Sequence, residues 1–166
     1  MVTTNMRPIR ETIGLDEALA LINEATKPLE RSERVVLSEA GGRVASRDVV
    51  SDQDVPPFDR AAMDGFAVVA EDTFGTTRYQ SKALKCVETV FTGQVPNRRV
   101  GRGECSQIAT GAPMPQGADA VVMVEETDRD VDNQVRIFTP VYPRQNVGGR
   151  GADIVPGQTL VRRDDF

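Results

Sequence analysis

Between residues 51 and 142 the chain repeats short apolar runs, each four to nine residues long and set between turn-forming residues. Runs of this length are typical of strands and are too short for most helices. The five runs span 66–69, 83–91, 104–108, 120–124 and 135–139. Five short strands with few helical segments between them favour a small β-barrel or a compact β-sandwich, with a hairpin turn at Asp132-Asn133 between the last two runs.

The clearest helical pattern lies near the start of the chain. From Leu15, apolar residues recur at positions i, i+3, i+4 and i+7, which forms one stripe of an amphipathic helix. Thr12 or Gly14 can cap this helix, and Pro28 lies beyond its end. We predict a helix at about 15–26.

The segments on either side of the β-rich part share a mixed helical and extended pattern. The expected elements are a strand at 35–37, one helical turn at 38–43, extended chain at 44–50, a turn at 156–158 and a strand at 159–161. The predicted fold class is therefore α+β, mostly β: a small α/β domain with an inserted β-barrel-like domain, in an elongated body.

We assign residues 1–50 and 143–166 to the α/β domain and residues 51–142 to the inserted domain. Residues 162–166 follow a strand without the polar tail or capped helix of a natural end. We therefore expect the chain to be a fragment.

The composition removes several kinds of chemistry. The chain has no histidine, so an imidazole base, a Ser-His-Asp triad and a histidine metal ligand are all excluded. Its two cysteines, Cys86 and Cys105, form no CxxC motif, and we expect two reduced, buried thiols rather than a disulfide. The remaining options are carboxylates, hydroxyls, ammonium or guanidinium groups, backbone amides and a hard cation such as Mg²⁺.

Charge and hydropathy limit the partners. A formal net charge of −5 gives no electrostatic reason to expect a nucleic acid. No apolar run approaches the ~20 residues of a membrane helix, and the first residues contain no apolar core of a secretion signal. We expect a cytoplasmic protein with no membrane partner.

The most informative stretch is residues 55–68, V-P-P-F-D-R-A-A-M-D-G-F-A-V, in which Asp64-Gly65 directly precedes an apolar run. Two prolines stiffen its entry, and a carboxylate at a tight turn is held by the backbone, which suits a cation or an oxyanion substrate. The alternative is an Asp-Gly turn that only begins a strand.

A second stretch begins with Thr110-Gly111 at the end of a predicted strand, and Pro113 and Pro115 hold the following loop extended. A hydroxyl beside a glycine, with unpaired loop amides nearby, can donate to an oxyanion such as phosphate or molybdate. The alternative is a rigid connection between two strands.

A third stretch, Arg150-Gly151-Ala152-Asp153, lies in a glycine-rich loop. It supplies one permanently charged guanidinium for an oxyanion and one carboxylate. The alternative is a surface turn with a weak ion pair.

Taken together, the three stretches match one family in order and spacing. Residues 58–68, 110–122 and 150–154 resemble the N-terminal region, domains I and II, of molybdopterin molybdenumtransferase, the MoeA / gephyrin E-domain family. Residues 15–19 and 39–44 resemble its opening helix and the turn that follows. The resemblance covers nearly the whole chain.

The resemblance implies a role in molybdenum-cofactor biosynthesis. Members of the family insert molybdate into molybdopterin, consume adenylylated molybdopterin in a Mg²⁺-dependent step and form elongated dimers. Their active site lies in a cleft between the second domain of one subunit and the third domain of its mate. We expect the family's pterin-binding and C-terminal domains to be missing from this chain.

The resemblance also assigns residues to that cleft. Asp64, Thr110 and Asp153 match catalytic positions, and Asp64 is also the metal-binding candidate. The positions that match substrate-binding residues are Arg150, Gly111 and Gly65.

Five residues depart from the family pattern. Arg60-Ala61 stands where the family usually has Asn-Ser, Gly148-Gly149 replaces commonly basic residues, and Ala152 replaces an acidic residue. The chain thereby loses a hydroxyl, a carboxylate and basic charge from the expected lining of the cleft.

The leading hypothesis is an enzyme fragment that supplies cleft residues and dimer surface, forms a weak homodimer, acts with molybdopterin pathway partners and is inactive alone. The alternative is a gephyrin-like interaction or scaffold module without catalysis. A parent gene that continues past Phe166 into a pterin-binding domain would favour the enzyme.

Overall fold

The computed structural model describes residues 12–129 and 132–166 of the chain, and this part is mostly β. It contains the α-helix α1 (Leu15–Ala25) and the 3-10 turns η1 (Leu37–Glu39), η2 (Ala70–Thr73) and η3 (Val124–Glu126). The strands are β1 (Val49–Val50), β2 (Arg60–Ala61), β3 (Gly65–Val68), β4 (Lys82–Val90), β5 (Glu104–Ile108), β6 (Ala120–Met123), β7 (Thr127–Arg129), β8 (Gln134–Ile137), β9 (Val147–Gly148) and β10 (Thr159–Val161).

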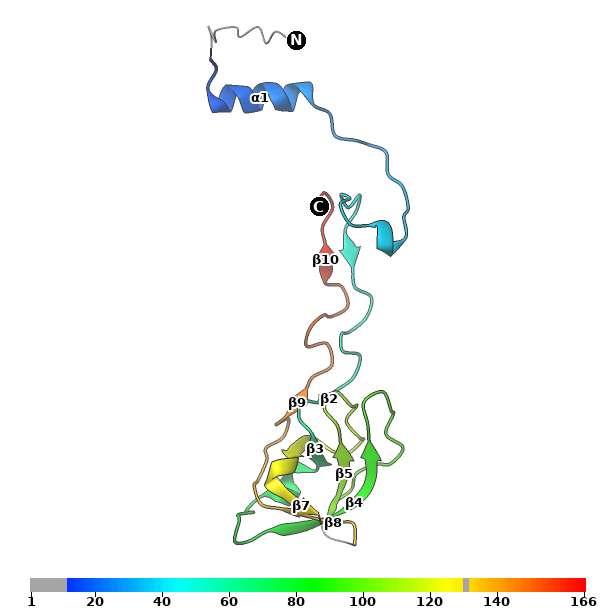
Figure 1. Ribbon diagram of the computed structural model, residues 1–166, viewed down its shortest axis with the longest axis vertical. Helices are drawn as coiled ribbons and strands as arrows, with labels where there is room; N and C mark the ends of the chain where they lie inside the picture. The colour runs from blue at the N-terminus through cyan, green and yellow to red at the C-terminus, as the bar shows by residue number, and fades with distance from the viewer. Residues whose placement is uncertain (1–11, 130–131) are drawn as a thin grey trace, which may run out of the picture.

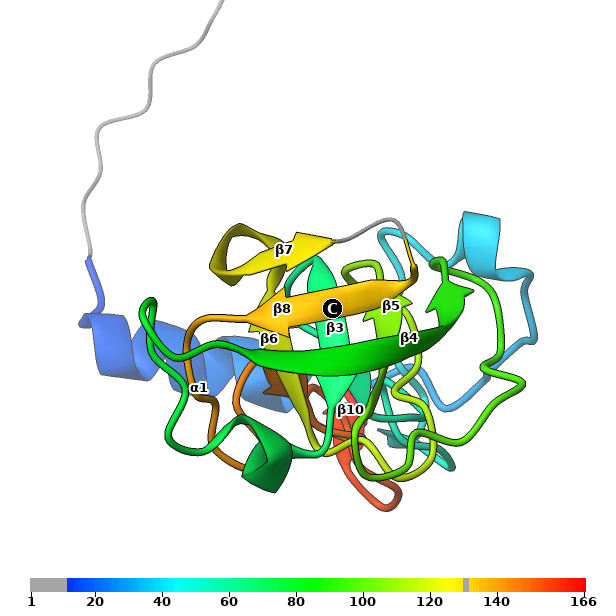
Figure 2. The same cartoon turned by 90° about the horizontal axis from the view of Figure 1, so that it is seen from below.

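Six strands form one sheet in the order β6-β3-β5-β4-β8-β7. All neighbours in it are antiparallel except β4 and β5, which are parallel. Figure 2 shows this sheet strongly curled, with β4 and β8 turned across the direction of β3. The five strands predicted between residues 51 and 142 are confirmed, and they close into a partial barrel.

The hairpin prediction needs a correction. Strand β8 pairs with the additional strand β7, whereas β6 pairs with β3, so the turn that contains Asn133 joins β7 to β8. Asn133 adopts a φ of 59° in this turn, a conformation that asparagine tolerates better than most residues. The three-residue strand β7 is too short and polar to give a strand pattern of its own.

The core covers both faces of β3, where all four residues are buried. Phe66 and Val68 pack into one apolar cluster with Val122, and Ala67 packs into a second cluster with Val121. A strand buried on both faces reads in sequence as a continuous apolar run, as β3 and β6 do. This doubly packed strand gives the residue in front of it, Asp64, a rigid support.

Cys86 and Cys105 lie opposite each other on the parallel strands β4 and β5. Both thiols are buried and free, which confirms the prediction of two reduced, buried cysteines. The hydrogen bond between the two side chains, together with burial, raises the pKa of the Cys105 thiol.

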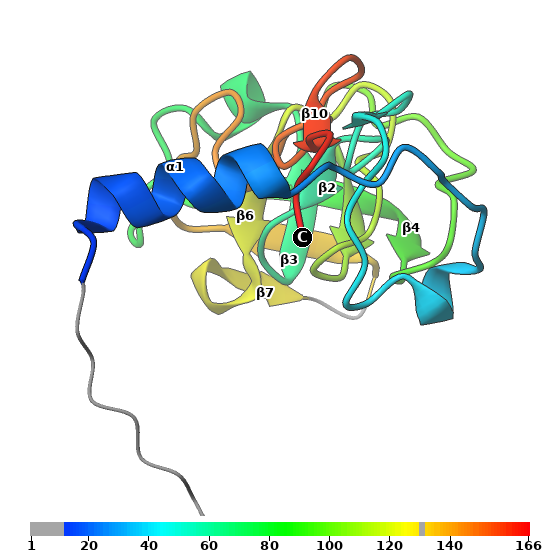
Figure 3. The same cartoon turned by 90° about the horizontal axis from the view of Figure 1, so that it is seen from above.

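Two short ribbons lie outside this sheet: β1 pairs with β10, and β2 pairs with β9. Figure 1 shows the six-stranded sheet at one end of a long molecule, the β1–β10 ribbon further along and α1 at the opposite end. Seen from above in Figure 3, α1 lies across this opposite end.

The helix predicted at 15–26 is confirmed as α1, with Gly14 at its N-cap and no side-chain capping bond. None of its residues is buried. Among the helices of the described chain, none combines the length and apolar character needed to span a bilayer.

The strand predicted at 35–37 is wrong, because residues 35–36 are irregular and Leu37 begins η1. Val36 and Leu37 are 62% and 92% exposed, and a β-prone run without a partner strand does not hold. Of the extended segment predicted at 44–50, only β1 is a strand.

The α/β character expected of the flanking segments therefore reduces to one helix and one short ribbon. In the described residues the fold is mostly β with a single α-helix, and the division into domains 1–50 plus 143–166 and 51–142 stays a prediction.

Candidate functional site

Asp64 and Thr110 meet at one end of the central strands. Asp64 directly precedes β3, and Thr110 follows shortly after β5. These strands are antiparallel with Gly65 opposite Ile108, so the start of one lies beside the end of the other. The backbone N–H and the hydroxyl of Thr110 both donate to Asp64 Oδ1, at 2.7 and 2.8 Å.

These two hydrogen bonds lower the pKa of the Asp64 carboxyl, with the backbone N–H of Thr110 contributing most and its hydroxyl next. Asp64 is therefore ionised at neutral pH. Its second oxygen, Oδ2, accepts no hydrogen bond from any described residue. The arrangement is a carboxylate held in place by neutral donors, with one oxygen left for a ligand.

Gly65 and Gly111, the two glycines predicted to bind substrate, both meet backbone requirements. A Cβ at Gly65 would lie 1.9 Å from the carbonyl oxygen of Val122, so only glycine lets β3 approach β6 here. Gly111 adopts a φ of +81°, which favours glycine in the turn after Thr110. Their roles in substrate binding stay predictions.

The loop amides nearest Thr110 are paired within the protein, and Pro113 has no N–H to offer. The amides of Gln116 and Gly117, further along the loop, donate to no described residue, so donation to an oxyanion by unpaired amides of this loop stays a prediction for those two positions. The N–H groups of Gly111, Ala112 and Met114 donate to the carbonyl oxygens of Ala61, Ala109 and Asp59, at 2.8, 3.0 and 2.9 Å.

Strand β2 lies between this loop and β9. Arg60 is paired with Gly148 on one side and forms an isolated bridge with Pro113 on the other. Ala61, 1% exposed, anchors β2 in the core. The three stretches singled out in the sequence thus meet along β2, whose two residues gave no strand pattern of their own.

Asp59 links the first stretch to the third, a role that the sequence motifs did not reveal. Its carboxylate accepts the Arg150 backbone N–H at 2.8 Å and forms an ion pair with the Arg144 guanidinium. Two hydrogen bonds lower the pKa of the Asp59 carboxyl: the one from the Arg144 side chain contributes most, and the one from the Arg150 backbone N–H comes next. Arg150 also donates from Nε to Asp54 Oδ2 at 2.6 Å.

Asp153 lies opposite a different cation. Its Oδ2 is 3.7 Å from Arg60 Nη2, an ion pair too long to be a hydrogen bond. Within the described residues, no hydrogen bond or ion pair joins Arg60 and Asp153 to Asp64 and Thr110. The two pairs are connected through the backbone of β2.

The donor set limits how a metal ion can bind. The described part of the chain contains no cluster of three or more carboxylate, thiol or imidazole groups suited to a metal. Mg²⁺ often keeps several waters and takes one or two carboxylates plus substrate phosphates. Asp64 Oδ2 fits that second kind of site and not a closed protein cage.

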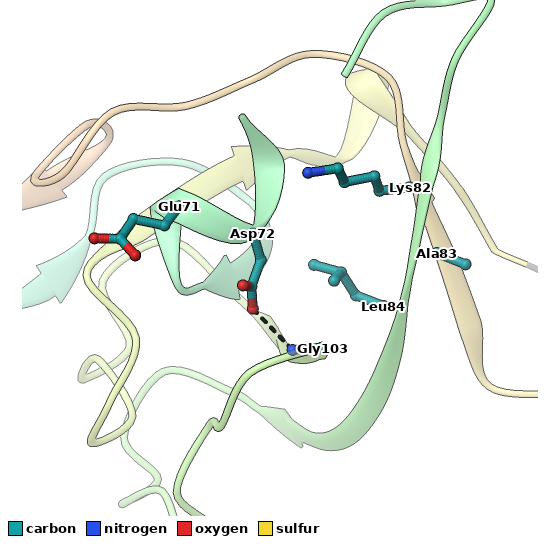
Figure 4. A pocket seen from close by; sticks show the side chains of 6 residues that line it. All are labelled: Glu71, Asp72, Lys82, Ala83, Leu84 and Gly103. Atoms are coloured by element: carbon teal, nitrogen blue, oxygen red, sulfur yellow. Dashed lines mark hydrogen bonds between the residues drawn. The ribbon is translucent and has the colours of Figure 1, made fainter. Parts of the chain in front are cut away.

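A hollow of about 350 Å³ lies at the other end of β3 and β5 (Figure 4). It contains none of the predicted site residues. Its carboxylates, Glu71 and Asp72, are both paired with Arg102, and Asp72 also accepts the Gly103 N–H at 2.8 Å. The lining residues in Figure 4 are Glu71, Asp72, Lys82, Ala83, Leu84 and Gly103.

A family model, two relatives of known name and a solved structure all relate this chain to the same family. Residues 13–165 match the family model described as the MoeA N-terminal region, domain I and II. The chain is 35% identical over 156 residues to molybdopterin molybdenumtransferase 2 of Mycobacterium tuberculosis. It is 30% identical over 156 residues to the molybdopterin molybdenumtransferase of Staphylococcus aureus. These alignments cover 94% and 93% of this chain and 36% of each relative.

The fold is also similar to a solved structure, the molybdopterin biosynthesis MoeA protein from Pyrococcus horikoshii OT3. The TM-score is 0.84 at 40% sequence identity, covering 89% of this chain and 39% of that one. The chain therefore spans little more than a third of the length of the relatives it matches.

Proposed function

The chain belongs to the family of MoeA N-terminal regions, and from this membership we propose that it supplies part of the active-site cleft of a molybdopterin molybdenumtransferase. In this proposal the whole enzyme inserts molybdate into adenylylated molybdopterin. Support comes from the relatives that carry the enzyme's name and match over more than nine-tenths of this chain.

The observation that carries the proposal is the clamp on Asp64. Thr110 uses both its N–H and its hydroxyl on Asp64 Oδ1, so Thr110 acts as a positioning residue and Asp64 as the group that meets the ligand. A fixed carboxylate needs no reorganisation when positive charge or a donor arrives. Asp153 and Arg150 line the same cleft in this proposal.

Mg²⁺ fits this site at Asp64 Oδ2, where it would supply positive charge to a phosphate of the substrate. The contribution of the chain itself is an ionised carboxylate at a set position.

The chain alone is expected to be inactive, because a transferase must hold the pterin and the oxyanion together and the second half of the cleft comes from elsewhere. We expect no molybdate insertion by the isolated 166 residues under conditions in which a complete relative turns over. Turnover by the isolated chain would contradict this part of the proposal.

The proposal also includes a homodimer and contacts with other proteins of the molybdopterin pathway. It includes a cytoplasmic location, which is consistent with the two free thiols.

The test is complementation. The chain, followed by the rest of its parent reading frame, is expressed in a strain that lacks its own molybdenumtransferase, and a molybdenum-dependent reductase provides the readout. We expect Asp64→Asn to lower activity by roughly 100-fold. We expect Thr110→Val to lower it less, because the carboxylate keeps the backbone N–H of residue 110 and loses only the hydroxyl hydrogen bond. Asp128→Asn, which breaks an exposed ion pair with Arg136 in the β7–β8 hairpin, is the matched control.

Thermal unfolding of each variant separates a lost function from a lost fold. Full activity of Asp64→Asn, or loss of activity together with loss of folding, would make Asp64 a structural turn residue.

A gephyrin-like scaffold is the second candidate, favoured by the uncovered apolar side chains of α1, where Leu15 is 76% exposed. Partner binding by a full-length parent that fails to complement the strain would favour this scaffold over the enzyme.

A further inference from the structure

Strand β9 ends at Gly148, Gly149 follows it, and an arginine side chain lies over each glycine. A Cβ at Gly148 would lie 3.3 Å from Cγ and 3.4 Å from Nε of Arg60, and a Cβ at Gly149 would lie 3.0 Å from Nη2 of Arg144. Neither glycine has a positive φ, so the backbone conformation does not require glycine there. The two glycines instead leave room for the two arginines.

Three guanidinium groups border this segment, and they differ in their partners. Arg144 donates to Asp59, and Arg150 donates from Nε to Asp54 at 2.6 Å. The Arg60 guanidinium donates no hydrogen bond to any described residue, and its nearest carboxylate is Asp153 at 3.7 Å. Arg60 is thus the arginine of the three whose guanidinium donates to no described residue, whereas Arg150 uses its Nε and leaves both Nη groups unused.

The part of the loop nearest Arg60 supplies few donors. The amides of Gly111, Ala112 and Met114 bond to β2, to the residue before it and to their own turn, and both donors of Thr110 are used by Asp64. An anion that enters beside Pro113, the residue bridged to Arg60, therefore lies next to the unused donors of Arg60. The planar guanidinium matches two oxygens of a tetrahedral anion at once.

We propose that Arg60 binds a doubly charged tetrahedral oxyanion over Gly148, next to the loop that begins at Thr110. Arg60, Gly148 and Gly149 are three of the five residues that depart from the family pattern, and the structure places Arg60 against Gly148, next to Gly149 in the chain. The basic charge missing from residues 148 and 149 is thereby supplied from β2. The identity of the anion rests on the proposed function: it is molybdate or the phosphate of the adenylylated substrate.

The balance of charges around Arg60 sets the affinity that we expect for the anion. Three arginines face three carboxylates, Asp54, Asp59 and Asp153, so no net positive field draws the anion in. Binding depends on the directed donors of Arg60, and we expect millimolar affinity in the chain by itself.

The experiment is a titration of the ¹⁵N-labelled 166-residue chain with molybdate and, separately, with AMP, at low and constant chloride. Shifts of the Arg60 Nε–H and of the Gly148 and Gly149 amides report the site. We expect Arg60→Ala to raise Kd by about tenfold or more, as for the loss of a charge-assisted hydrogen bond. Arg136→Ala, at the exposed ion pair with Asp128, is the control and leaves Kd unchanged.

A relocation variant makes the test specific to the position of the charge. Arg60→Ala removes the side-chain atoms that lie 3.3–3.4 Å from a Cβ at residue 148, so Gly148→Arg is less crowded in the double variant than in the wild type. We expect the double variant to regain most of the affinity. Tighter binding of molybdate than of AMP assigns the site to the metal oxyanion, and the reverse assigns it to the phosphate of the adenylylated substrate.

Unchanged Kd in Arg60→Ala, no rescue by the double variant, or no binding of either anion by the wild type at millimolar concentration would each overturn the inference. Thermal unfolding confirms that each variant is folded. Complementation distinguishes this proposal from the proposed function. If the chain binds the anion through Arg60 but its parent does not complement the strain, only the proposed function is refuted. If the parent complements the strain but anion binding does not depend on Arg60, only the anion site is refuted.

Discussion

Asp59 and Asp64 lie five residues apart in one motif, yet their surroundings give them different tasks. Asp59 is neutralised by Arg144 and by the Arg150 N–H, so its charge is used to tie the third stretch to the first. Asp64 is held by neutral donors from Thr110 and keeps its full negative charge. At the scale of the residue, the partner decides whether a carboxylate is a structural clamp or a ligand-binding group.

The clamp at Asp59 predicts a pH-dependent stability. Because its pKa is lowered in the folded state, the ionised side chain stabilises the fold above its unfolded-state pKa of about 3.9, and this stabilisation is lost as pH falls through the folded-state pKa. We expect Asp59→Asn to lower the free energy of unfolding at pH 7 by no more than about 1 kcal/mol, because the pair is exposed, and by less at pH 3. Urea unfolding at both pH values measures this difference.

The control for this prediction is Asp132→Asn, an exposed carboxylate in the β7–β8 turn. An effect of Asp59→Asn that is equal at pH 7 and pH 3 would show that the ion pair does not stabilise the fold.

The close approach of β6 to Gly65 predicts that a side chain at this position destabilises the fold. Since an added Cβ would lie 1.9 Å from the Val122 carbonyl oxygen, Gly65→Ala must push β3 away from β6. We expect a loss of about 1–3 kcal/mol in the free energy of unfolding, as for an overpacked core. Gly41→Ala, where nothing lies within 4 Å and φ is not positive, is the matched control in urea unfolding. Equal stabilities of the two variants would contradict the close approach of β3 and β6.

At the scale of the element, α1 has a good helical pattern and little tertiary support. It has 11 residues, none of them buried. Isolated helices shorter than about 12–15 residues are marginal in water. The sequence pattern therefore specifies where the helix forms, and its stability must come from a surface that covers its apolar stripe.

The difference in burial between α1 and β3 predicts that their backbone amides exchange hydrogen at different rates. In dilute chain we expect the amides of α1 to exchange much faster than those of β3, which is buried on both faces. Exchange followed by mass spectrometry measures this, with the exposed β1–β10 ribbon as an internal comparison for weakly packed backbone. Protection of α1 equal to that of β3 in dilute solution would mean that the helix is stable without a partner surface.

At the scale of the whole molecule, many uncovered apolar side chains lie outside the six-stranded sheet. Leu15, Leu19 and Ile22 of α1 are 76%, 49% and 56% exposed, and the β1–β10 ribbon leaves Val49, Val50 and Leu160 about half exposed. A stable interface needs roughly 1,000 Å² of well-fitted surface, which these side chains by themselves would barely provide.

We therefore expect a weak homodimer with a micromolar Kd, measured by sedimentation over a wide concentration range. Leu19→Glu is expected to weaken it, because a charge enters the apolar stripe of α1. The matched control Val95→Glu changes a side chain of the β-rich part that is 78% exposed and leaves the dimer unchanged. A strict monomer at the highest concentration would contradict this prediction.

Local sequence patterns were sufficient for elements that depend on near neighbours. The helix α1 and the strands β3, β4, β5, β6 and β8 were predicted within one or two residues, because apolar periodicity and turn residues determine them locally. The same patterns failed at residues 35–37, where the β-prone side chains have no strand to pair with. They also missed β2 and the parallel pairing of β4 with β5, which depend on contacts across the fold.

The sequence by itself determined which chemical groups this protein has and where the helix α1 and five strands of the six-stranded sheet lie. Those properties depend on residue type and on spacing over a few positions. Only the tertiary structure decided how the groups are used: Thr110 gives both donors to a carboxylate 46 positions away, Asp59 accepts an N–H 91 positions away, and Arg60 keeps its donors available. Hydrogen-bond partners so far apart in the chain are chosen by strand order and register, which no local pattern specifies.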